Sequence, residues 1–171
     1  MKNKTLIILL IILIGAFSRI IPHPPNFTAI GAISILGGLY FNKKYLAFIT
    51  PITAMFLSDI LLGYTPIISV YIAFLMIIPL GIKMRENLTY SSIFKTSIYA
   101  GILFFLITNF TSWLYNPIYP QNVSGLIMSY TAGIPFFANT LLGNLFFCFS
   151  LFGLYEIISK RKFIYINSWK K

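Results

Sequence analysis

Long apolar runs alternate along this chain with short polar segments. The runs cover about residues 5–21, 28–41, 45–62, 67–82, 92–112 and 135–158. A helix that crosses a bilayer needs ~20 predominantly apolar residues, and most of these runs come near that length. The pattern therefore predicts an all-α, polytopic membrane bundle of six transmembrane helices joined by short connections. We expect one transmembrane domain over residues 1–171.

The composition supports a membrane protein over a soluble one. Hydrophobic residues make up 58% of the chain and charged residues 9%, whereas soluble domains carry ~25% charged residues. A net charge of +10 could indicate nucleic-acid binding. The basic residues, however, lie in short clusters between apolar runs, which is typical of the cytoplasmic loops of membrane proteins. The expected partner is the lipid bilayer, and no nucleic acid is expected.

The basic clusters predict the orientation of the chain. With the N-terminus inside, twelve of the thirteen Lys and Arg residues fall on the cytoplasmic side. They form four groups: Lys2 with Lys4, Lys43 with Lys44, Lys83 with Arg85 and Lys95, and the basic residues from 160 to 171. The exception is Arg19. This pattern favours an N-in/C-in, multi-pass protein of the bacterial cytoplasmic (inner) membrane.

The first apolar run also resembles a signal peptide, with Ala16 and Ser18 flanking a possible small-residue cleavage site. The apolar run continues beyond that site to Ile21. We therefore expect the first helix to be retained.

Two connections differ from simple loops. The first holds Pro22, Pro24 and Pro25 and leads into a short apolar run, so we expect it to pack inside the bundle, where its free backbone groups could find partners. The second, residues 113–133, contains the apolar piece 126–134. Ser124 could cap this piece as a separate interfacial or re-entrant helix. Residues 117–133 would then act as a lid.

Most intramembrane polar residues fall in the predicted outer half of the bundle. The candidate substrate-binding residues are Arg19, His23, Asn26, Asp59, Asn109, Trp113, Asn139, Thr140 and Asn144. Asp59 is the only acidic residue outside the predicted cytoplasmic side, and Arg19 is the only Lys or Arg there. A charge in the membrane core costs ~2.5–3.5 kcal/mol on insertion scales. We therefore expect Arg19 and Asp59 to approach each other or a shared ligand.

Helical spacing brings several of these candidates onto common faces. Asn109 and Trp113 are four residues apart, as are Thr140 and Asn144. Amides offer donors and acceptors, and an indole offers a flat surface, so together they suit a planar or amide-bearing molecule. An alternative interpretation also stands. The ion pair and amides could only lock helices together, Trp113 could be an interfacial anchor, and His23 could hydrogen bond within its turn.

The residues argue against an enzyme. One His, one Cys and three widely spaced acidic residues do not predict a metal site. No glycine-rich phosphate loop followed by Lys and Ser or Thr is present in the sequence. We predict no catalytic residue, no metal and no cofactor, so any ATP-driven transport would need a separate ATPase.

Several motifs carry a resemblance to a known family. They are Pro22-His23-Pro24-Pro25-Asn26-Phe27-Thr28 after Arg19, Gly37-Gly38 with Tyr40-Phe41, Ser58-Asp59, Thr108-Asn109-Phe110 with Trp113, and Pro135-Phe136-Phe137 with Asn139-Thr140 and Gly143. Together they resemble the membrane family DUF6580, which in turn is similar to the substrate-binding S components of energy-coupling factor (ECF) transporters. The resemblance covers about residues 19–152.

The resemblance implies six helices, a pocket open to the outside and uptake of a small-molecule substrate. It also implies a transmembrane coupling subunit that joins two ATPase subunits. The alternative is a non-transport scaffold, an MreD-like subunit of cell-envelope morphogenesis, in which the polar residues only hold helices together.

Overall fold

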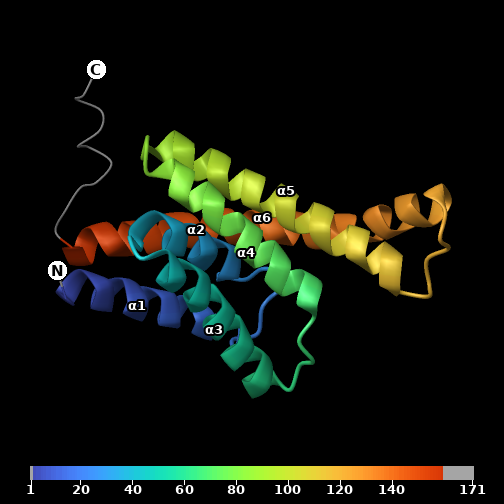
Figure 1. The fold of residues 1–171 in the computed structure, drawn as a ribbon, viewed down its shortest axis with the longest axis horizontal. Helices are drawn as coiled ribbons and strands as arrows, with labels where there is room; N and C mark the ends of the chain where they lie inside the picture. The colour runs from blue at the N-terminus through green and yellow to red at the C-terminus, as the bar shows by residue number, and fades with distance from the viewer. Residues whose placement is uncertain (1, 160–171) are drawn as a thin grey trace.

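The computed structural model describes residues 2–159. Its regular secondary structure is entirely helical, with no strand in that range. Six helices follow one another (Figure 1): α1 Lys2–Phe17, α2 Ile30–Tyr40, α3 Lys44–Leu62, α4 Ile68–Met84, α5 Tyr90–Tyr115 and α6 Val123–Ser159. The all-α class predicted from the apolar runs is confirmed.

Three of the described helices are long and apolar enough to cross a membrane. They are Lys44–Leu62, Tyr90–Tyr115 and Val123–Ile157, with mean hydropathies of 1.7, 1.5 and 1.6. The other apolar helices are shorter: Thr5–Phe17, Ile30–Tyr40 and Ile68–Met84. Large apolar side chains such as Leu61 and Ile68 are exposed on the outside of the bundle, as in a protein surrounded by lipid. The arrangement with six spans stays a prediction.

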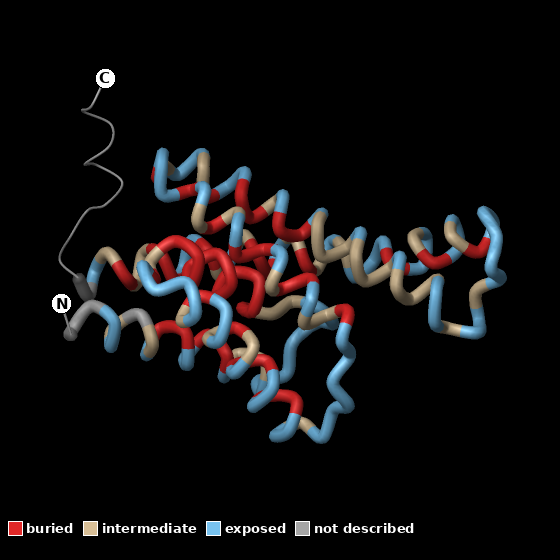
Figure 2. The backbone as a smooth tube through the Cα atoms, viewed as in Figure 1, coloured by how far each residue is buried: buried red, intermediate tan, exposed pale blue. Residues whose placement is uncertain are grey.

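Helix α2 forms the centre of the bundle. Every residue from Ile30 to Leu39 is buried, and α2 packs against all the other helices (Figure 2). Its glycines allow this burial, because a Cβ at Gly38 would overlap the carbonyl oxygen of Ile78 in α4. The small residues of α2, Gly31, Ala32, Ser34, Gly37 and Gly38, favour packing inside the bundle over docking of a partner, and their burial confirms the internal packing.

The two ends of the bundle differ in charge. Figure 1 shows the start of α1, the α2–α3 turn, the α4–α5 turn and the end of α6 at one end of the molecule. Lys43, Lys44, Lys83 and Lys95 lie at or near these two turns. Arg85 has a local role there, since its guanidinium donates to the carbonyl oxygens of Gly38 and Phe41 at the C-terminus of α2.

The proline-rich connection does not pack inside the bundle, contrary to the prediction. Residues 20–26 are exposed, so solvent or headgroups rather than protein groups can satisfy the carbonyls that the prolines leave free. Only its last part turns inward. Phe27 is half-buried, and its ring lies 5.8 Å from that of Phe146 and 5.6 Å from that of Phe147.

The separate re-entrant helix predicted for residues 126–134 is also wrong. Helix α6 runs without a break through this piece, with Pro135 inside it. Asn122 rather than Ser124 caps its start, because the backbone N–H of Gly125 donates to Asn122 Oδ1 over 2.9 Å. Asn139, Thr140 and Asn144 therefore lie in the middle of a long helix instead of its first turns.

Candidate functional site

A buried ion pair stands at the base of the site. Arg19, just beyond α1, places Nη1 2.8 Å from Asp59 Oδ1 of α3, and the two side chains are 10% and 3% exposed. The same nitrogen donates to Ser58 Oγ (2.5 Å) and to the backbone carbonyl of Met55 (3.3 Å). The approach of Arg19 to Asp59 predicted from the sequence is confirmed, and it ties the end of α1 to α3.

The second carboxylate oxygen of Asp59 also has a partner. Tyr71 of α4 donates its hydroxyl to Asp59 Oδ2 over 2.6 Å. The turn between α3 and α4 makes this possible: Gly63 adopts a left-handed φ of 69° and ends α3. The Tyr64 backbone N–H then donates to the Asp59 carbonyl oxygen over 2.8 Å. The ion pair thus extends into a network over the end of α1, α3 and α4.

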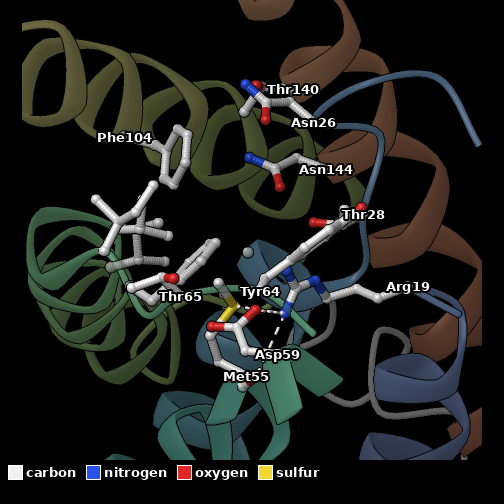
Figure 3. A pocket seen from close by; sticks show the side chains of 15 residues that line it. Arg19, Asn26, Thr28, Met55, Asp59, Tyr64, Thr65, Phe104, Thr140 and Asn144 are labelled. Carbon is white, nitrogen blue, oxygen red and sulfur yellow. Dashed lines mark hydrogen bonds and ion pairs between the residues drawn. The ribbon is translucent and has the colours of Figure 1, made fainter. Parts of the chain in front are cut away.

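A cavity of about 230 Å³ opens above this network (Figure 3). Its walls come from the α1–α2 connection, α2, the α3–α4 turn and α3 to α6. The lining residues are Arg19, Asn26, Thr28, Gly31, Met55, Asp59, Tyr64, Thr65, Ile67, Val70, Phe74, Ile77, Phe104, Thr140 and Asn144. Figure 3 shows Asn26, Thr140 and Asn144 on the side of the cavity opposite Asp59. One face therefore carries the ion pair and the other carries neutral polar groups.

A second cavity of about 440 Å³ adjoins the first, between α5 and the first half of α6. It shares four residues with the first cavity: Asn26, Ile67, Phe104 and Thr140. The remaining lining residues are Phe105, Thr108, Asn109, Ser112, Tyr119, Ser129, Ala132, Gly133, Phe136 and Phe137. The segment predicted to be a lid thus supplies part of the wall of this cavity, through Tyr119, Ser129, Ala132 and Gly133.

Two asparagine side chains pack directly against glycines of a neighbouring helix. A Cβ at Gly31 of α2 would overlap Oδ1 of Asn144, and a Cβ at Gly133 of α6 would overlap the amide of Asn109. Asn144 Nδ2 reaches the Ser97 carbonyl over 3.4 Å, and Asn109 Nδ2 donates to the Phe105 carbonyl over 2.8 Å. Only a residue without a Cβ lets each amide lie this close to the neighbouring helix.

Asn26 lies where the two cavities meet. It is the one residue other than glycine with a positive φ, 64°, in the described chain. Asn tolerates this conformation better than most residues, but it remains strained. Its side-chain amide makes no hydrogen bond to any described residue and borders both cavities. Since Asn26 is also exposed, its amide is available to a ligand in either cavity.

Some predicted site residues are not brought to the cavities. His23 is exposed in the proline-rich connection. Trp113 donates its indole N–H to the Pro120 carbonyl over 3.0 Å, while Gln121 Nε2 donates back to the Trp113 carbonyl over 2.7 Å, so it closes the α5–α6 loop. Asn139 is half-buried and lines neither cavity.

Other lining residues were not predicted. Thr28, Thr65, Phe74 and Phe104 line the first cavity, and Tyr71 holds Asp59 beside it. For Phe104 a signal existed, since it precedes Thr108 by four residues and so shares a face with it. Tyr71 carried no such signal, because its proximity to Asp59 depends on how the α3–α4 turn folds.

The sequence pattern of the family of unknown function DUF6580 matches residues 1–167 of this chain. No curated protein matches it, and no solved structure matches it.

Proposed function

The chain belongs to DUF6580, a family of unknown function, and we propose that it is the substrate-binding membrane subunit of a transporter. The observation that carries this proposal is the pair of joined cavities, lined by polar side chains from three helices, α3, α5 and α6, and from the three connections α1–α2, α3–α4 and α5–α6. Binding sites for small molecules span ~300–1,000 Å³ and combine apolar walls with a few placed polar groups. The cavities have this character.

The proposed orientation follows from charge. The turns that carry Lys43, Lys44 and Lys83 lie at one end of the molecule, whereas the α1–α2 connection and the α3–α4 turn, which border the cavities, lie away from that end (Figure 1). With basic turns on the cytoplasmic side, the site faces the outside of a bacterial cytoplasmic membrane. In this proposal all six helices cross the membrane, N-in/C-in, in an arrangement similar to ECF S components.

The proposed role is binding rather than catalysis. In this proposal a transmembrane coupling subunit and two ATPase subunits supply the energy for uptake. The basic end of the bundle would then face the ATPase subunits on the cytoplasmic side.

Native mass spectrometry of the protein purified from its own membranes in mild detergent tests the proposal. We expect a retained small molecule, which Thr140→Val should remove. Thr131→Val is the matched control. Both threonines lie in α6 and donate to the carbonyl four residues earlier, over 2.9 and 2.8 Å, but only Thr140 lines the cavities. Equal retention by both variants, or no retained molecule in the wild type, would count against the proposal.

The scaffold alternative rests on the ion pair itself. Arg19, Asp59 and Tyr71 join the end of α1 to α3 and α4. Such a network can have a purely structural role, which is to fix the positions of the helices. Under this alternative, Arg19→Ala lowers the melting temperature, no small molecule copurifies, and cell-envelope proteins are retained instead.

A further inference from the structure

We propose that the site takes an uncharged, elongated ligand with a carbonyl-type acceptor at one end, which meets Arg19, and an aromatic end in the second cavity. This inference rests on the proposed function, because it concerns the ligand of the same site.

The first step is the charge balance of the lining. Arg19 and Asp59 are the charged residues among the two sets of lining residues, and they neutralise each other at 2.8 Å. Both carboxylate oxygens are engaged, one by Arg19 and the other by Tyr71. A ligand with a net charge would enter a site with no charge left to pair with it, at a substantial desolvation cost. The site therefore favours a neutral ligand.

The second step concerns the N–H groups of Arg19 that make no hydrogen bond to the described protein. All of its hydrogen bonds to described residues, and the ion pair, are made by Nη1. Its Nε and Nη2 groups donate to no protein group in the described part of the chain. Because the side chain is only 10% exposed and borders the first cavity, these N–H groups are available to an acceptor inside that cavity. A carbonyl oxygen accepts them without bringing a charge.

The third step is the length of the site. The cavities share Asn26 and Thr140, so a ligand that starts at Arg19 can continue past them into the second cavity. The second cavity has aromatic walls, in which the rings of Phe105 and Phe137 lie 4.6 Å apart. The hydroxyl of Thr108 is already bonded to its own helix, at Phe104 O. These rings suit a flat aromatic group at this end of the site, beside polar side chains such as Ser112 and Tyr119 that also line it.

Two matched probes test the inference: 4-phenylbutanamide and 4-phenylbutanoate, which share a skeleton and differ in charge. Binding of each at millimolar concentration is measured by ligand-observed NMR and by thermal shift of the full-length protein in mild detergent. We expect the amide to bind roughly tenfold or more tightly than the carboxylate. Equal affinities, tighter binding of the carboxylate or no binding of either probe would overturn the inference.

Two variants sharpen the test. Asp59→Asn keeps the size of the side chain but leaves Arg19 unpaired, so the preference should shift toward 4-phenylbutanoate. Asn26→Gly keeps access to the positive φ and removes the amide at the junction, and we expect it to weaken the binding of 4-phenylbutanamide severalfold while the protein stays folded. If neither variant changes the discrimination between the probes, the ligand does not occupy this site.

The outcomes separate this inference from the proposed function. A copurified molecule with a net charge, lost in Thr140→Val, would support a binding subunit and overturn the neutral ligand. If the protein discriminates between the probes but takes up no solute, the result would support the neutral site and overturn the transport role.

Discussion

Gly81 of α4 lies directly against the backbone carbonyl of Ile35 in α2, with no room for a Cβ atom between them. Since backbone, not a flexible side chain, occupies the space, Gly81→Ala must push α2 and α4 apart. We expect Gly81→Ala to lower the free energy of unfolding by about 1–3 kcal/mol or more. The measurement is the melting temperature in mild detergent.

Gly153→Ala in α6 is the control for this prediction. A Cβ at Gly153 would meet no atom within 4 Å, and alanine favours a helix over glycine by about 1 kcal/mol. Its melting temperature should equal or exceed that of the wild type. If both variants behave alike, α2 and α4 do not pack as closely as described.

The ion pair between Arg19 and Asp59 predicts strong non-additivity. Asp59→Ala leaves a buried guanidinium without its partner, which typically costs about 3–5 kcal/mol. The double variant Arg19→Ala with Asp59→Ala removes both charges and should cost less than the sum of the single variants. A double-mutant cycle on thermal or denaturant unfolding measures the coupling. Additive effects would mean that the two side chains do not interact in solution.

Arg85 should contribute to stability through α2 rather than only through membrane orientation. Its guanidinium binds the carbonyl oxygens of Gly38 and Phe41, which the helix leaves without an intrahelical partner. We expect Arg85→Ala to cost about 0.5–1.5 kcal/mol, because the bonds come from a charged donor but Arg85 is an exposed residue, where water competes for them. Arg85→Lys should retain only part of this stability, since a lysine cannot match the planar guanidinium. Lys83→Ala, at an exposed residue of the same turn, should leave the melting temperature almost unchanged.

The start of α6 offers a local test of the cap. Asn122 Oδ1 accepts from the Gly125 N–H, whereas Ser124 lies inside the helix. Asn122→Ala should destabilise the protein by about 1 kcal/mol, the usual cost of losing such a cap. Ser124→Ala should have little effect. Both effects are measured as melting temperatures. If Ser124→Ala lowers the melting temperature more than Asn122→Ala does, Ser124 is the cap, as expected from the sequence.

The sequence alone determined the helical class of this protein and its apolar character, because the length and polarity of each run depend only on local composition. It also predicted that Arg19 and Asp59 approach each other or a shared ligand, since two opposite charges isolated among apolar residues have few other partners. The close packing of α2 followed from its small residues. These inferences depend on residue type and spacing rather than on helix angles.

Only the tertiary structure decided which polar residues share a cavity. Asn109 and Asn144 reach the cavities because Gly133 and Gly31 let them lie against a neighbouring helix, while Asn139, on another face of α6, does not. The rotation of α6 sets these faces, and it depends on the unbroken path of the helix from Val123. Tyr71 meets Asp59 only through the turn at Gly63. Such relationships join residues from different helices, so no local pattern in the chain encodes them.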